Sequence, residues 1–234
     1  MRAAGAIRTN LLDLLRYVDL YLHRGRVGRE RIVSPASLAE MLRPHIEVHR
    51  GLYYGYGIAV RPDYHGHFVA AHSGDLKGVA SEFMVVPRAG VAGAVLANVD
   101  GAPSGRILEE GINRLLGLDP RSRFADVPPP VGPATPLSEF GGWYCSGEGI
   151  WLHVTPRVRD LRLDFHGIEL VGRRLKLRPH GTDTFTLRVR GWTAVVPFLR
   201  DRRGRVSAVH LGWRVVRRRD PRTLTQARRG RMVW

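Results

Sequence analysis

One proline-rich segment restricts how this chain of 234 residues can fold. The stretch VPPPVGPATP, residues 127–136, holds five prolines in ten residues. Proline has no backbone N–H and a fixed φ, so this stretch is typical of a semi-rigid linker rather than of a helix or a central strand. We therefore predict a linker over 121–137 between one domain, residues 1–120, and a second domain, residues 138–220. Residues 221–234 are predicted to form a basic tail.

The first domain shows helical and strand patterns in turn. Asn10 or Thr9 can cap a first helix, and Ser34 followed by Pro35 is typical of the start of a second one. The predicted helices cover residues 10–24, 34–44 and 103–117, and the predicted strands cover residues 51–60, 67–71, 81–86 and 93–98.

Turns predicted at Gly74-Asp75 and at Pro87–Gly90 separate the later strands and favour antiparallel pairing. The apolar stripe of the first helix is predicted to consist of Leu11, Leu14, Leu15, Val18 and Leu22. The order helix, helix, four strands, helix predicts an α+β domain in which helices cover an antiparallel sheet.

Beyond the linker the chain shows strand patterns only. Apolar and polar residues alternate, and turn sequences such as HG, HGTD and DRRG separate the alternating segments. These segments lie near residues 141–146, 150–156, 160–165, 168–178, 183–190, 193–200 and 205–216. Roughly eight short strands at this spacing predict a small all-β barrel or sandwich.

The net charge of +16 is unevenly distributed along the chain. Residues 1–120 hold 14 basic and 12 acidic side chains, whereas residues 121–234 hold 23 and 9. A half with a net charge of +14 can attract a polyanion, which is one alternative function. Nucleic-acid binding is not favoured, because aromatic residues are not interleaved with the arginines. Arginines that fill the solvent-exposed faces of strands explain the charge equally well.

Cys145 is the only cysteine, so no disulfide within the chain and no zinc-cysteine site is encoded. In the YCSG sequence, Cys145 is more typical of a small packed side chain than of a nucleophile, and Ser146 of a structural serine. Charged residues interrupt the N-terminal apolar stretch, so we predict no signal peptide and, for the chain as written, a cytoplasmic protein. No stretch approaches the ~20 apolar residues of a membrane-spanning helix.

Histidine, serine and aspartate fall within four residues at His72, Ser73 and Asp75. Successive side chains of a strand point to opposite faces, so His72 and Ser73 cannot act there as base and nucleophile. Triad partners are also usually distant in the sequence. A local catalytic triad is therefore not expected.

Two histidine pairs have spacings found in metal sites. His45 and His49 are four residues apart, but Pro44 ends the preceding helix and HIEVH does not match HExxH. His65 and His67 flank a glycine, which is typical of a surface turn. We expect neither a metal site nor a cofactor.

Four stretches together resemble a known family. GAIRTNLLDLLRYVDLYLHRG, ERIVSPASLAEML, YGYGIAV and HSGDLKGVASEFMVVPRAGVAGAVLANVDG occur in this order within residues 5–118. They resemble the C-terminal half of the β-lactamase-like serine hydrolases, which include class C β-lactamases, serine D-Ala-D-Ala carboxypeptidases and related esterases and peptidases. The resemblance implies hydrolysis of an amide or ester, in a small molecule or a peptide, through an acyl-serine.

This family uses three motifs: Ser-x-x-Lys, a Tyr-x-Asn-like element, and Lys-Thr-Gly or His-x-Gly on a strand. His72-Ser73-Gly74 matches the third motif. The resemblance implies that the backbone of this strand pairs with the acyl substrate. It also implies that His72 or Ser73 holds a substrate carboxylate or the developing charge, and that Gly74 allows close approach.

Ser-x-x-Lys is absent from all 234 residues, and Tyr-x-Asn is absent from residues 1–71. Covalent catalysis needs a nucleophile with an adjacent base, so we expect no hydrolysis by this chain alone. A truncated gene, a misplaced start codon and one half of a split enzyme remain as explanations. A non-catalytic binding or regulatory protein is the other alternative function.

The resemblance also implies that further strands normally pair beside the strand over 93–98. An apolar unpaired edge there is expected to recruit a second chain or a second copy of this chain. Residues 138–218 resemble the lipocalin-like barrel that follows the catalytic domain in some family members. LSEFGGWYCS, LKLRPHGTDTFTL and VPFLRDRRGRVSAVHL carry that resemblance.

Overall fold

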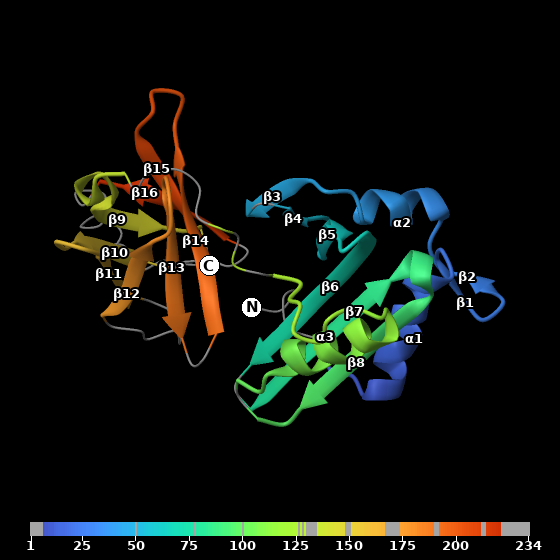
Figure 1. Cartoon of the computed structure of the whole chain (residues 1–234). Coiled ribbons are helices and arrows are strands. Elements are labelled where there is room, and N and C mark those ends of the chain that lie inside the picture. The colour runs from blue at the N-terminus through green and yellow to red at the C-terminus, as the bar shows by residue number, and fades with distance from the viewer. Residues whose placement is uncertain are drawn as a thin grey trace. The chain divides into compact units, whose positions relative to one another are not determined.

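The computed structural model shows antiparallel sheets that form two compact units, residues 1–126 and 127–234 (Figure 1). Each unit is described by itself. The structure describes residues 7–49, 51–76, 78–99, 101–125, 127, 129, 135–147, 151–166, 174–189, 192–211 and 214–220. The predicted tail and much of the predicted linker lie outside these residues.

The first unit is built on a six-stranded antiparallel sheet with the strand order β3-β4-β5-β6-β7-β8. Its strands are β3 (Ile46–His49), β4 (Leu52–Tyr54), β5 (Ala59–Tyr64), β6 (His67–Leu76), β7 (Val79–Val86) and β8 (Val91–Ala97). Its helices are α1 (Leu11–Leu22), α2 (Pro35–Met41) and α3 (Ser104–Leu115), and β1 (Arg26–Val27) and β2 (Glu30–Arg31) form a separate hairpin.

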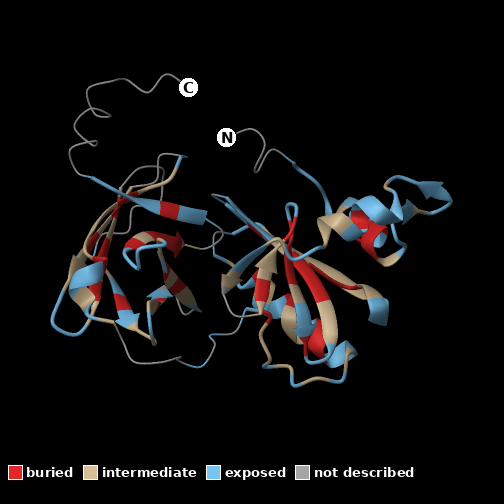
Figure 2. Cartoon of the chain, turned by 90° about the horizontal axis from the view of Figure 1, so that it is seen from above, coloured by how far each residue is buried: buried red, intermediate tan, exposed pale blue. Residues whose placement is uncertain are grey.

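Helices cover both faces of this sheet, because successive strand residues bury apolar side chains on opposite sides. Met84 and Val86 pack with Leu108 and Ile112 of α3 in one core cluster. Val85 belongs to a second cluster, which contains Val18, Leu20 and Tyr21 of α1. Figure 2 shows this buried layer in red along the sheet.

The helix starts agree with the sequence prediction. The side chain of Asn10 accepts a hydrogen bond from the backbone N–H of Asp13, and that of Ser34 accepts one from Ser37. The predicted stripe of α1 is wrong in its first half, because Leu11 and Leu15 are 43% and 37% exposed. Only the second half of α1 packs fully on the sheet.

The single strand predicted over 51–60 is wrong, since the chain turns between β4 and β5. Gly55 lies against the end of α2, where a Cβ atom would be 2.3 Å from the carbonyl oxygen of Met41. Gly57 has a φ of +72°, which interrupts an extended strand. A tight turn follows, closed by a hydrogen bond of 2.8 Å from the N–H of Gly55 to the carbonyl of Ile58.

The turn predicted at Gly74-Asp75 is also wrong. Strand β6 continues through both residues and pairs with β7 as far as Leu76 opposite Val79. The turn predicted at Pro87–Gly90 is confirmed, with Gly90 at a φ of +68°. The four predicted strands become six because β3 and the split of β4 from β5 were not recognised.

The second unit is a closed barrel of eight antiparallel strands, as the spacing of segments predicts. Its strands are β9 (Gly142–Cys145), β10 (Trp151–Pro156), β11 (Leu161–His166), β12 (Leu175–Pro179), β13 (Thr184–Val189), β14 (Trp192–Arg200), β15 (Val206–Leu211) and β16 (Arg214–Arg219). The segment predicted over 205–216 is two strands, β15 and β16. Pairing of β16 with β9 closes the barrel.

Aromatic side chains fill the barrel interior. The ring of Phe140 lies edge-on to that of Phe185, with centroids 4.9 Å apart, and both contact Phe198. The buried hydroxyl of Tyr144 donates to the carbonyl of Phe140 over 2.7 Å. The centre of this small barrel is therefore a packed core.

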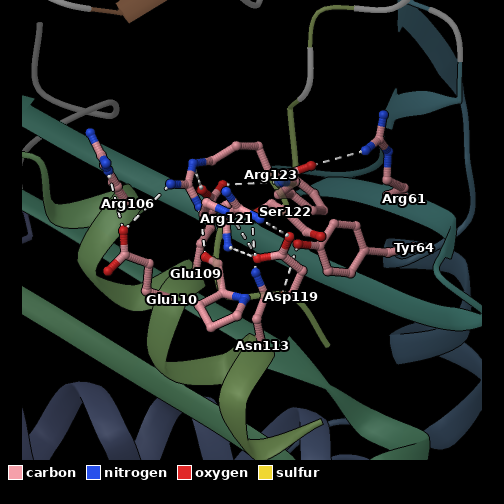
Figure 3. Close-up of polar contacts among 12 residues, drawn as sticks. Arg61, Tyr64, Arg106, Glu109, Glu110, Asn113, Asp119, Arg121, Ser122 and Arg123 are labelled. Carbon is pink, nitrogen blue, oxygen red and sulfur yellow. Dashed lines mark hydrogen bonds and ion pairs between the residues drawn. The ribbon is translucent and has the colours of Figure 1, made fainter. Parts of the chain in front are cut away.

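A polar network ties the segment after α3 to α3 itself and to β5 (Figure 3). Asn113, 1% exposed, accepts a hydrogen bond of 2.9 Å from the hydroxyl of Tyr64 and donates one of 3.0 Å to the carbonyl of Ser122. Arg123 donates to the carbonyl of Ser122 and forms an ion pair with Glu110. These contacts hold α3 against β5 and the sheet.

Removing the hydroxyl of Tyr64 leaves a buried acceptor of Asn113 without this donor. We expect Tyr64→Phe to lower the free energy of unfolding by about 1–3 kcal/mol, measured by urea titration. The matched control is Tyr56→Phe, at a tyrosine that is 58% exposed, which should change it by less than about 0.5 kcal/mol. Equal losses in both variants would contradict the role of this network.

Candidate functional site

The longest strand of the first unit has one free backbone edge. Strand β6 pairs with β7 from Ala70 to Leu76, the C-terminal end of the strand. On its other side, β5 covers it only as far as Ala71, which lies opposite Ala59. Among the described residues, no strand pairs with this side of β6 beyond Ala71.

The register identifies which backbone groups point outward at this edge. In a two-residue hairpin the residues that flank the loop, here the register partners Leu76 and Val79, form a hydrogen-bonded pair. Along an antiparallel ladder such pairs alternate with pairs whose backbone groups point away from each other. The N–H and C=O groups of Ser73 and Asp75 therefore point away from β7. They offer two donors and two acceptors to an extended ligand.

His72 lies at the start of this edge and is held by aromatic neighbours. Its Nε2 atom and the hydroxyl oxygen of Tyr54 lie 2.9 Å apart in a hydrogen bond. Its ring is nearly parallel to that of Phe83, at a centroid distance of 6.5 Å. Phe83 in turn contacts Tyr17 and Tyr21 of α1. The imidazole is half-buried and has a fixed orientation.

Ser73 and Gly74 continue the same edge and are exposed. Ser73 follows His72 directly on the strand, so its side chain points to the face of the sheet opposite to that of His72. A Cβ atom on Gly74 would lie 2.5 Å from the side-chain oxygen of Ser81, which donates to the carbonyl of Gly74 over 3.2 Å. The absence of a side chain at Gly74 leaves room for Ser81 and for a ligand at the edge.

Glu82 lies directly opposite Ser73 on β7. Burial, and to a smaller extent the charge of Glu109, raise the pKa of this carboxyl to about 8. A Cβ atom on Gly105 would lie 3.4 Å from its Oε2, so the carboxyl packs against the first turn of α3. A helix N-terminus favours a carboxylate, but here desolvation dominates.

The other histidines considered for a metal site lie apart from this edge. Nε2 of His45 donates a hydrogen bond of 3.1 Å to the carbonyl of Glu40, and its ring stacks on Tyr56 with centroids 4.1 Å apart. His65 has a φ of +52° in the β5–β6 turn, and His67 begins β6. The side chain of His49 lies outside the described residues.

Cys145 is half-buried in the barrel, where its thiol donates to the carbonyl of Ser146 over 3.1 Å. Burial raises the pKa of this thiol, which lowers the fraction of thiolate at neutral pH. This agrees with a packed side chain rather than a nucleophile.

At the far edge of the sheet, β8 pairs with β7 and, in the described part of the chain, with no other strand. Leu96 and Val99 near its end are 39% and 56% exposed. The apolar edge expected from the sequence is thus present. None of the helices that the structure describes is both long and apolar enough to cross a membrane.

No protein-family model and no curated protein matches the sequence. Solved structures do match. SurE is 23% identical with a TM-score of 0.61, covering 90% of this chain and 48% of that one. SurE with D-Leu is 20% identical with a TM-score of 0.63, covering 90% and 50%. The octameric penicillin-binding protein homologue from Pyrococcus abyssi is 23% identical with a TM-score of 0.44, covering 88% and 46%.

These likenesses concern the fold alone. The similarity in fold rests on the two SurE structures, whose TM-scores exceed 0.5. The chain spans about half the length of the solved structures that it matches.

Sequence reasoning missed two residues of this region. Tyr54 is 18 positions before His72, and only its place in the aromatic run LYYGYG could have indicated it. Glu82 directly precedes the apolar run FMVV in SEFMVV, and a lone charge beside such a run can indicate an unusual environment of that side chain.

The raised pKa of Glu82 predicts a pH-dependent stability. The folded chain keeps this carboxyl protonated up to about pH 8, while the unfolded chain releases the proton near the ordinary value of 4.5. Its contribution is therefore fully present below about pH 4.5 and is lost as the pH rises to about 8. Urea unfolding at several pH values measures this.

We expect Glu82→Gln to reduce the loss of stability across this window and to stabilise the chain at pH 8 relative to the unchanged protein. Glu30→Gln is the control, because Glu30 is exposed on β2. Identical pH profiles for the unchanged chain and Glu82→Gln would contradict the assignment.

Proposed function

We propose that the first unit supplies one wall of a β-lactamase-like acyl-hydrolase site and binds the acyl part of an amide or ester substrate. The proposal assigns residues 1–120 to this domain, 121–137 to a linker and 138–220 to a lipocalin-like barrel. The free half of β6 carries the argument, because it presents unpaired backbone groups beside His72-Ser73-Gly74.

The chemistry of this edge suits an extended substrate. The outward N–H groups of Ser73 and Asp75 can donate to carbonyl oxygens, and the carbonyl groups can accept from an amide, as in β-strand addition. Donors fixed before the substrate arrives stabilise negative charge without a cost of reorganisation. His72, oriented by Tyr54, lies where it can donate a hydrogen bond to a carboxylate.

The same proposal includes the absence of turnover by this chain alone. Neither Lys77 nor Lys176 follows a serine at the Ser-x-x-Lys spacing. Acyl transfer to serine requires a nucleophile and a base within hydrogen-bond reach. The nucleophile must then come from a chain or segment other than these 234 residues, and a partner that pairs with the edge of β8 is one source.

A non-catalytic binding function is the second candidate, and the same observation favours it. A strand edge with fixed donors and acceptors binds an extended peptide whether or not a nucleophile is present. Under this candidate the edge of β6 is a peptide-binding site in its own right.

The test uses a peptide that ends in D-Ala-D-Ala as the probe. The family resemblance implies D-amino-acid substrates for some members, and one of the similar SurE structures contains D-Leu. We expect saturable binding of acetyl-Lys-D-Ala-D-Ala by calorimetry, weakened about five- to tenfold by His72→Ala through the loss of a charge-assisted hydrogen bond. His67→Ala, on the paired half of the same strand, is the matched control.

A backbone variant tests the edge itself. Asp75→Pro removes an outward N–H while leaving the hydrogen bonds to β7, and should abolish binding. Asp75→Ala keeps that N–H and should bind as the unchanged chain does. Undiminished binding by Asp75→Pro would contradict the edge. Separately, turnover of a chromogenic β-lactam or ester that disappears in His72→Ala would contradict the absence of hydrolysis.

A further inference from the structure

A cationic cavity lies on the outside of the barrel, at one end of β11 and β12. Its volume is about 300 Å³, which is the lower end of the range for small-molecule sites. The lining residues are Arg157, Asp160, Leu161, Arg162, Arg174, Leu175 and Lys176. Four of these seven side chains carry a positive charge and one carries a negative charge.

Among the described residues that line the cavity, the single carboxylate is already neutralised. Nζ of Lys176 forms an ion pair of 2.8 Å with Oδ2 of Asp160, whose side chain is only 18% exposed. The guanidinium groups of Arg157, Arg162 and Arg174 form neither an ion pair nor a hydrogen bond in the described part of the chain. The described lining therefore keeps an excess of about three positive charges.

The strand pairing places like charges beside one another. Arg162 lies directly opposite Lys176 in the β11–β12 ladder, an arrangement that normally destabilises a sheet. The turn between β10 and β11, closed by a hydrogen bond of 2.8 Å from the N–H of Arg157 to the carbonyl of Asp160, brings Arg157 to the same place. The strand pairing and this turn thus bring Arg157, Arg162 and Lys176 together around one cavity.

Arg174 adds a conformational feature to this arrangement. Its φ of +69° is in the left-handed region, which residues other than glycine and asparagine rarely adopt. Its backbone N–H donates to Oδ1 of Asp164 over 2.7 Å, and this bond holds the strained residue. Strain of this kind is concentrated at ligand sites.

We propose that this cavity binds a small phosphorylated molecule. Guanidinium groups form paired hydrogen bonds with phosphate oxygens, and several unpaired ones around one cavity match an anion with more than one charge. A singly charged carboxylate would leave most of the excess charge uncompensated. Arg162 and Arg174 are the principal ligands, and the Lys176–Asp160 pair fixes one wall. This site is independent of the function proposed for the first unit.

The test is calorimetric titration of the full chain with inorganic pyrophosphate at two salt concentrations. We expect one saturable site whose affinity falls about tenfold in Arg162→Gln and again in Arg174→Gln, because each change removes a charge-assisted hydrogen bond. Arg202→Gln is the matched control, since it removes the same charge from an exposed turn outside the cavity. Far-ultraviolet circular dichroism establishes that all three variants are folded.

Two further ligands distinguish the alternatives. Citrate that binds as tightly as pyrophosphate, with the same losses in the two cavity variants, would overturn the preference for phosphate. A single-stranded oligonucleotide that binds more tightly, with equal losses in Arg202→Gln and in the cavity variants, would overturn the discrete site and indicate a diffuse polyanion surface. The absence of saturable pyrophosphate binding would overturn the proposal altogether.

Discussion

The candidate site of the first unit depends on a difference in length between two neighbouring strands, β5 and β6. Strand β5 begins at Ala59, opposite Ala71, whereas β6 continues to Leu76. The chain cannot enter β5 earlier, because Gly55 is held against the carbonyl of Met41 at the end of α2. The unpaired half of β6, and with it the candidate substrate wall, is therefore a consequence of how α2 packs. A strand edge of this kind is a template for an extended ligand as well as a risk of aggregation.

The two faces of the sheet differ around this edge. On one, His72 is surrounded by the aromatic rings of Tyr54 and Phe83, which orient it. On the other, Glu82 is half-buried beside the start of α3, and desolvation raises the pKa of its carboxyl to about 8. The candidate edge thus has an oriented imidazole on one face of the sheet and a carboxyl with a raised pKa on the other. In the barrel, by contrast, the interior is a packed apolar and aromatic core, and the clustered charges lie around the cavity at β11 and β12.

Local signals in the sequence predicted helix starts well and sheet pairing poorly. Asn10, Ser34 and Pro35 act on atoms within a few residues, so their capping roles can be read from the sequence. The split of residues 51–60 into two strands depends on the contact of Gly55 with α2, which no local pattern records. Likewise, Gly74 was interpreted as a turn residue because glycine often ends strands, yet pairing with Ser81 keeps it extended.

Residue order alone establishes that Ser-x-x-Lys is missing. It also predicts that prolines separate a mixed α and β part from a strand-only part, and that a strand over 67–71 leads into His72. These features depend on neighbouring residues or on composition. Only the folded chain decides the free edge of β6, the hydrogen bond between Tyr54 and His72 and the raised pKa of Glu82. The same holds for the group of arginines that have no partner among the described residues. Each of these features results from burial or strand pairing between residues far apart in the sequence. The distances in space between such residues are defined only once the sheet has formed.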